Sequence, residues 1–282
     1  MNLTERIYFW TLSAAALAYV FYLAWLDEFY GASLTWSLAL LLIIGVAAFS
    51  WWRPKDDLAR RARPIFFIAA GGFIIYVLIP WLFHWLWKLF PRSSLIWRVP
   101  GMDYFAEALW YAVALAAVIL LFRIVAPKDF RERFFLRFNW QWEDTLILIG
   151  LAAATALVMW LYLSFINPNE GWSPLKTTGS PLAFALFGIL SSAANALAEE
   201  FWYRGYFLGL LARVLKPWQG IALTALLFGI IHIHGIPSGA LGVALAAIYG
   251  AVLAIWTWKR GSIWQAVCLH FLTDMVIFFG VN

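Results

Sequence analysis

Long apolar stretches alternate with short polar ones along the whole chain. Nine of these apolar stretches are close to the length of about 20 residues that a helix needs to cross a bilayer. They cover residues 8–26, 34–52, 65–87, 104–125, 144–165, 181–213, 219–233, 238–258 and 262–280. The sixth is too long for one straight span, so we expect it to be tilted or broken, or to extend into the cytoplasmic interface. This pattern predicts an all-α polytopic membrane protein with about eight or nine transmembrane helices.

Composition supports the same fold class. The 282 residues are 64% hydrophobic and 12% charged, whereas a soluble domain is roughly half apolar and about a quarter charged. The 19 Trp, 24 Phe and 11 Tyr fit aromatic belts at two membrane interfaces. We therefore expect an integral, multi-pass protein surrounded by membrane lipid, in the plasma membrane of a bacterium or archaeon or in the endoplasmic reticulum.

Basic residues gather in alternate loops between the apolar stretches. The second, fourth, sixth and eighth loops hold most of them, for example Arg60, Arg131, Lys216 and Lys259. By the positive-inside rule, the N-terminus is cytoplasmic and the C-terminus lies outside. The net charge of +5 thus reflects topology and does not point to nucleic acid.

The fourth loop carries Phe130, Phe134 and Phe138 at every fourth position, beside several arginines. This spacing indicates either an amphipathic helix on the cytoplasmic surface or an ordinary basic loop. The polar segment 167–180 follows the fifth apolar stretch. We take it as the boundary between residues 1–179, which hold about five helices of unassigned role, and residues 180–282, which hold the polar clusters.

Six ionisable side chains lie inside apolar stretches of the second part. They are Glu199, Glu200, Arg204, His232, His270 and Asp274. At ~1.5 Å of rise per residue, Glu200 and His232 lie roughly 20 Å from the cytoplasmic ends of their helices, and Asp274 roughly 18 Å. Three of the predicted helices, the sixth, seventh and ninth, therefore bring ionisable groups to similar depth. Such groups inside a membrane usually mark a functional site.

Helical spacing suggests how these side chains pair. Glu200 and Arg204 are four residues apart and share a helix face, which predicts an ion pair. Glu199 is turned away from Arg204 and is left as a candidate general base. Asp274 follows His270 by four residues and can hold its imidazole, while Phe228 precedes His232 by four and can pack on it.

The three motifs resemble those of a known family. Glu199-Glu200-x-x-x-Arg204, Phe228-x-x-x-His232 and His270-x-x-x-Asp274 look like the motifs of the CAAX protease and bacteriocin-processing (Abi) family, which includes the Ras-converting CAAX endopeptidase. The likeness covers residues 180–280, just over a third of the chain. The family more often has Asn at the last position, so Asp274 is a departure.

The resemblance implies an intramembrane glutamate-type endopeptidase. It would cut a peptide near a membrane-associated or lipid-modified terminus, without a cofactor. Glu199 and His232 would hold and activate water, and Glu200 and Arg204 would complete the polar site. His270 would stabilise the oxyanion, with Asp274 orienting its ring because an ionised Asp cannot donate a hydrogen bond.

Two other classes of function fit the same residues. Glu199, His232 and His270 would also supply a zinc ligand set for a metallopeptidase, although no His-Glu-x-x-His sequence is present. The polar cluster also suits a non-catalytic membrane protein, such as an immunity factor, a scaffold or a proton-coupled transporter. Transport is the less favoured of these because the two halves show no inverted repeat.

Overall fold

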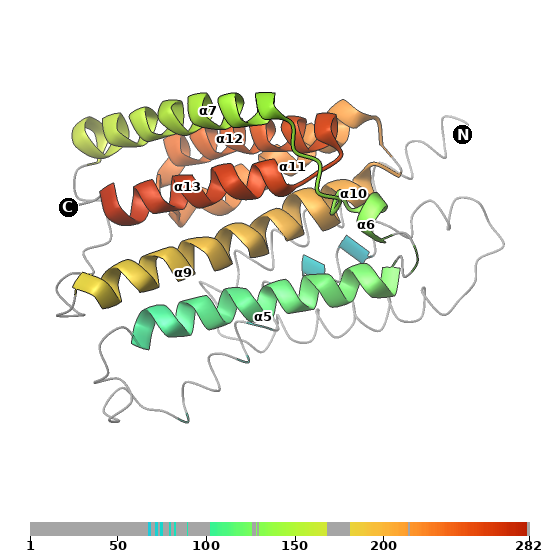
Figure 1. Cartoon of the computed structure of the whole chain (residues 1–282), viewed down its shortest axis with the longest axis horizontal. Coiled ribbons are helices and arrows are strands. Elements are labelled where there is room, and N and C mark those ends of the chain that lie inside the picture. Colours follow the sequence, from blue (N-terminus) through green and yellow to red (C-terminus); the bar gives the residue numbers. More distant parts are fainter. Residues whose placement is uncertain are drawn as a thin grey trace. The chain divides into compact units, whose positions relative to one another are not determined.

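The protein is all-helical over the described part of the chain (Figure 1). The computed structural model describes residues 102–125, 130–167, 181–213 and 215–280, with isolated positions between 67 and 89 and residue 128. The predicted stretches 8–26 and 34–52 lie outside these residues, and so does most of 65–87. The total of eight or nine helices therefore stays a prediction.

Each predicted stretch from residue 104 onward coincides with a helix or with consecutive helical turns. The helices are α5 (Met102–Val125), α6 (Phe130–Arg133), α7 (Trp142–Leu161) with the π-helical turn η3 (Tyr162–Ile166), α9 (Pro181–Glu200) with the π-helical η4 (Phe201–Phe207) and α10 (Leu208–Leu211), α11 (Pro217–Ile231) with the 3₁₀ turn η5 (His232–His234), α12 (Gly239–Arg260) and α13 (Trp264–Gly280).

The sixth stretch forms one continuous run of helical turns and is not broken. A π-helical segment, η4, follows α9 directly and leads into α10, so Glu200 is the last residue before the hydrogen-bonding pattern changes. Five of its seven residues are aromatic, and all seven are buried. Gly205 lies at a close approach, because a Cβ there would come within 2.9 Å of the ring of Phe122. π-helical turns of this kind often occur at functional sites.

The chain divides into two compact units, and one of them comprises Phe90–Gly209 with Lys216–Asn282. In this unit α9 packs between α5 and α13, α7 packs on α13, and α11 packs on α12 (Figure 1). The functional boundary near residue 180 stays a prediction. Helices before and after residue 180 belong to this one compact unit.

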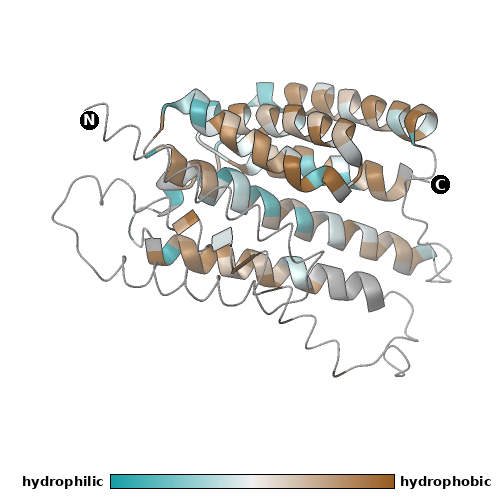
Figure 2. Ribbon diagram, turned by 180° about the vertical axis from the view of Figure 1, so that it is seen from behind, coloured by the Kyte–Doolittle hydropathy of each residue, from teal (hydrophilic) through white to brown (hydrophobic). Residues whose placement is uncertain are grey.

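The outer helices carry the surface of a membrane protein. Two segments, Trp142–Ile166 and Gly239–Arg260, are long and apolar enough to cross a bilayer. On α7, large apolar side chains such as Leu146, Ile149 and Leu157 are exposed. Figure 2 shows hydrophilic colour along α9, between more apolar helices. The apolar surface and the polar interior agree with an integral membrane protein.

A long amphipathic helix in the fourth loop is not formed. The helix α6 ends at Arg133, and Phe135 adopts a positive φ of 56°. Phe134 is fully buried and stacks on Phe122 with ring centroids 4.6 Å apart, whereas Phe138 is 73% exposed. The three phenylalanines therefore do not share one lipid-facing stripe, because Phe134 is packed in the core.

A buried carboxylate fixes one end of the bundle. Asp144, near the start of α7, is fully buried and accepts hydrogen bonds from Trp256 Nε1 (3.0 Å) and Gln265 Nε2 (3.2 Å). It also forms a 2.7 Å ion pair with Arg260 Nε. One polar cluster therefore ties α7 to the end of α12 and the start of α13, which is the helix that carries His270. The sequence patterns did not indicate this cluster.

Candidate active site

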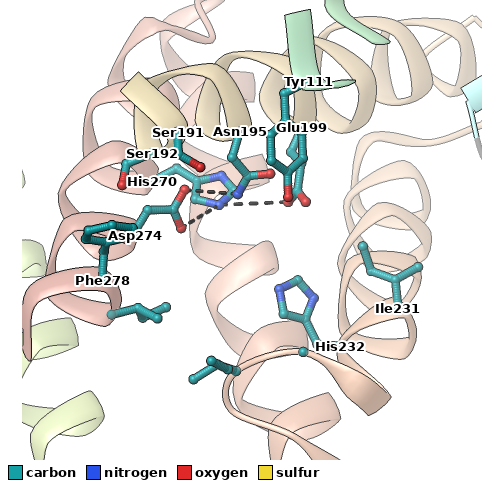
Figure 3. A pocket seen from close by; sticks show the side chains of 13 residues that line it. Tyr111, Ser191, Ser192, Asn195, Glu199, Ile231, His232, His270, Asp274 and Phe278 are labelled. Atoms are coloured by element: carbon teal, nitrogen blue, oxygen red, sulfur yellow. Dashed lines mark hydrogen bonds and ion pairs between the residues drawn. The ribbon is translucent and has the colours of Figure 1, made fainter. Parts of the chain in front are cut away.

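A cavity of about 330 Å³ opens in the middle of the bundle (Figure 3). Its walls come from α5, α9, α13 and the end of α11. The lining residues are Tyr111, Ser191, Ser192, Asn195, Glu199, Ile231, His232, Gly235, Ile236, His270, Asp274, Ile277 and Phe278. Four of the six predicted site residues are among them. Glu200 and Arg204 do not line the cavity, and both are fully buried.

Glu200 links two cationic or protonated partners. Its Oε1 accepts a 2.7 Å hydrogen bond from Arg204 Nη1, so the predicted ion pair is present. The same oxygen is 2.7 Å from His270 Nδ1. Because an ionised carboxylate only accepts, this ring nitrogen carries a proton. Glu200 therefore holds His270 as well as Arg204, although the sequence suggested only the second contact.

Arg204 is fixed by contacts on two further helices. Its Nη2 donates to the carbonyl oxygen of Gly250 at 3.2 Å, and its guanidinium lies 4.4 Å from the ring centroid of Phe228. The second contact has cation–π geometry. A Cβ at position 250 would lie 3.3 Å from Nη2. A glycine at this position on α12 thus leaves room for the guanidinium.

Glu199 is the carboxylate that remains without a tight partner. No ion pair with Arg204 is found, and its side chain is 22% exposed toward the cavity. Its Oε2 lies 3.8 Å from His270 Nε2 and makes no hydrogen bond within the described residues. The geometry therefore agrees with the predicted division between the paired Glu200 and the free Glu199.

His270 presents its second nitrogen to the cavity wall. Nε2 lies 3.5 Å from Asp274 Oδ1 and 3.8 Å from Glu199 Oε2, and both distances exceed those of a good hydrogen bond. The predicted contact with Asp274 is thus looser than the contact with Glu200. A ring anchored through Nδ1 keeps Nε2 available for a group in the cavity.

His232 faces these residues from the other side of the cavity (Figure 3). Its Nδ1 is 2.7 Å from the carbonyl oxygen of Phe228, which can only accept, so Nδ1 carries the proton. In the neutral ring, Nε2 is then an acceptor. The ring also packs on Phe228 with centroids 4.6 Å apart, as the spacing suggested.

Several lining residues were not singled out from the sequence. Asn195 donates from Nδ2 to Asp274 Oδ2 at 2.9 Å. It precedes Glu199 by four residues, so the spacing that paired the other residues would have indicated it. Ser191 lies one turn further along the same face of α9. Tyr111 comes from α5, where no polar cluster marks its position.

The predicted zinc ligand set is not assembled in this arrangement. No group of three His, Cys, Asp or Glu side chains with metal-binding geometry occurs among the described residues. His270 Nδ1 is already bonded to Glu200, which leaves only Nε2 of that ring for a ligand role. The donor geometry therefore gives the zinc alternative no support.

An apolar groove of about 220 Å³ adjoins the polar cavity. Side chains of α7, α12 and α13 form it, among them Leu151, Val158 and Val252, and it shares His232, His270 and Asp274 with the cavity. An apolar ligand in the groove would therefore lie directly beside the polar side chains.

Comparison with known proteins gives one family. Residues 181–276 match the family model described as type II CAAX prenyl endopeptidase, Rce1-like. This segment begins at the start of α9 and contains all six predicted site residues. No curated protein and no solved structure matches the chain.

Proposed function

Because residues 181–276 form an Rce1-like domain of the type II CAAX prenyl endopeptidase family, we propose that the protein is an intramembrane glutamate-type endopeptidase. Its substrate is a peptide with a membrane-associated, prenylated C-terminus. One observation carries the proposal: Glu199 faces the cavity without a tight partner, opposite His232, while the neighbouring Glu200 is locked between Arg204 and His270.

Glu199 and His232 act on the water that attacks the peptide. The Glu199 carboxylate takes one proton of the water, and His232 Nε2 accepts a hydrogen bond from the other. The oxygen of the water then bonds to the carbonyl carbon of the substrate. A positioned base of this kind typically contributes 10²–10⁴-fold to the rate.

His270 acts on the charge that develops at the carbonyl oxygen. His270 acts here as the imidazolium, in which Nδ1–H is bonded to Glu200 and Nε2 also carries a proton. As the carbonyl electron pair moves onto oxygen, Nε2–H donates to the oxyanion, and this interaction is strongest in a site that excludes water. The carbon–nitrogen bond then breaks, and the proton held by Glu199 passes to the departing nitrogen. The products are a new carboxyl terminus and a released peptide amine. The ring stays in place through its bond to Glu200.

The apolar groove suits the prenyl group of the substrate. It adjoins the catalytic side chains, and its lining from α7 and α12 is mostly apolar. Binding of a hydrocarbon chain in the groove is favourable because its apolar surface is removed from water. The adjacent peptide bond then lies near Glu199. We expect Ala154→Phe, which fills part of the groove, to raise KM for a prenylated peptide and not for the same peptide without its lipid.

The proposal is tested with Glu199→Gln in the full chain, purified in detergent and given a prenylated CAAX peptide. Cleavage, followed by mass spectrometry, should be lost while the yield and thermal stability of the protein stay unchanged. Glu143→Gln, on α7 away from the cavity, is the matched control and should cleave normally. Full cleavage by the Glu199 variant would overturn the mechanism.

The same preparation separates a peptidase from a transporter or a scaffold. Hydrolysis in micelles needs no sealed membrane, whereas proton-coupled transport does. We expect cleavage by the wild-type protein in detergent. Proton flux into sealed vesicles with no peptide cleavage would favour transport.

Chelation addresses the zinc alternative. Cleavage should persist in excess chelator, and elemental analysis of the active protein should find no stoichiometric metal. Loss of cleavage that zinc alone restores would favour a metallopeptidase instead.

A further inference from the structure

Asn195 joins α9 to the catalytic face of α13. Its Nδ2 donates to Asp274 Oδ2 at 2.9 Å, and Asp274 Oδ1 lies 3.5 Å from His270 Nε2. The side-chain amide and the imidazole therefore approach the two oxygens of one carboxylate. Both side chains line the same cavity, where Figure 3 shows them next to each other.

We propose that Asn195 is a further catalytic residue, which donates a hydrogen bond to the oxyanion together with His270. The amide nitrogen has two hydrogens, and Asp274 accepts one of them. The second is left for a group in the cavity. Asp274 itself cannot fill this role, because an ionised carboxylate has no hydrogen to donate.

The amide orientation follows from the same contact. Only an N–H group can face a carboxylate oxygen favourably, so Nδ2 points to Asp274 and Oδ1 points away. Asn195 Oδ1 is buried and has no hydrogen-bond partner within the described residues. A buried acceptor without a partner is unfavourable. The contact with Asp274 nevertheless holds Nδ2 in place, which is typical of a functional position.

Asp274 acts through these two donors. It lies against both and accepts from the amide, so it orients Nδ2 and limits the rotation of the His270 ring. In this account Asp274 is a positioning residue, and the two nitrogens are the groups that touch the reacting atoms. The account rests on the proposed function, because it assigns a role in peptide hydrolysis.

The test is the kinetics of Asn195→Leu, which has nearly the same shape but no donor. With a prenylated CAAX peptide, kcat per folded molecule should fall about 10²–10³-fold, the range found for loss of one oxyanion donor, and KM should change little. A peptide aldehyde, whose hydrate mimics the tetrahedral intermediate, should bind more weakly by a similar factor. Binding of an uncleavable substrate analogue should not change.

A double variant that exchanges the residue types at positions 195 and 274 keeps the test informative even if Asn195→Leu fails to fold. Asn195→Asp alone places a second carboxylate against that of Asp274 and removes the amide donor, so this variant should be inactive. Asn195→Asp combined with Asp274→Asn restores one amide and one carboxylate and returns a donor to the same wall. We expect the double variant to recover at least about tenfold in kcat over Asn195→Asp, as coupled residues do. Leu190→Ala, on the exposed face of α9, should behave as wild type.

The outcomes separate this role from the proposed function. A wild-type chain that cleaves no peptide would overturn both. If the wild type cleaves and Asn195→Leu retains its kcat per folded molecule, only the role of Asn195 is overturned. The same holds if KM alone rises, because the amide would then bind the substrate and not the oxyanion.

Discussion

At the scale of single residues, Arg204 depends on a very small set of contacts. It is fully buried, and Glu200 is its only ion-pair partner within the described residues. Breaking a buried pair by removing one member typically costs 3–5 kcal/mol, because the other charge stays behind. Substitutions in the Glu200–Arg204 pair therefore test how much this ion pair contributes to the stability of the protein.

We expect Arg204→Leu to lower the free energy of unfolding by about 3–5 kcal/mol and to reduce the amount of protein in the membrane. The double variant Glu200→Gln with Arg204→Leu removes both charges and should recover much of that loss. Denaturant unfolding in detergent, followed by tryptophan fluorescence, measures both. A single variant as stable as wild type would contradict the expectation.

Contacts within one helix could be predicted from the sequence, whereas contacts between helices could not. The four-residue spacing indicated both the Glu200–Arg204 pair and the packing of His232 on Phe228. The tight contact between His270 and Glu200 joins residues 70 positions apart. It depends on how α13 is rotated against α9, and no single-helix pattern contains that rotation.

At the scale of elements, α11 and α12 meet at a small residue. A Cβ on Gly229 would lie 2.6 Å from the carbonyl oxygen of Val243 and 2.7 Å from Ala247 Cβ. Backbone atoms cannot move aside as a flexible side chain can. Small residues at such a crossing allow two helices to approach closely.

Gly229→Ala should therefore destabilise the protein by about 1–3 kcal/mol, as overpacking does. Gly150→Ala is the matched control, because a Cβ on that α7 residue meets nothing within 4 Å. It should be neutral or slightly stabilising. Thermal unfolding of the two variants side by side gives the answer, and equal midpoints would argue against the close approach.

The cluster around Asp144 should matter for α13 although it is remote from the cavity. Asp144→Ala leaves Arg260 Nε and Trp256 Nε1 without their acceptor, so we expect the free energy of unfolding to fall by about 3–5 kcal/mol. Glu143→Ala, at the neighbouring and less buried position, should cost far less. A comparison of their unfolding midpoints checks this, and a mild Asp144→Ala would mean that water replaces the lost acceptor.

Helix boundaries were easier to predict than irregular turns inside helices. From residue 104 onward, apolar runs indicated every long helix, because a continuous run is enough to define one. The length of the sixth run suggested a tilt or a break, whereas the structure has a π-helical segment inside a continuous helix. This segment, Phe201–Phe207, is densely aromatic, and its rings pack on Phe122 of another helix, which no pattern within one helix contains.

At the scale of the whole molecule, the predicted topology can be tested directly. Basic loops indicate that Lys216 is cytoplasmic and that the loop containing Thr178 lies outside. In a Cys268→Ser background, Thr178→Cys should react with an impermeant maleimide in intact cells. Lys216→Cys should react only after the membrane is opened. The reverse labelling pattern would show that the chain is inserted the other way.

The spacing of the buried partners also sets an order during synthesis. Arg204 is made four residues after Glu200, whereas His270 follows Glu200 by 70 residues and Asp274 follows Asn195 by 79. When α9 leaves the ribosome, Arg204 is already available to Glu200 one turn away, whereas His270 has not yet been made. The pair therefore neutralises Glu200 as this helix enters the bilayer, and the wall of the cavity that joins α9 to α13 is complete only after α13 has been made.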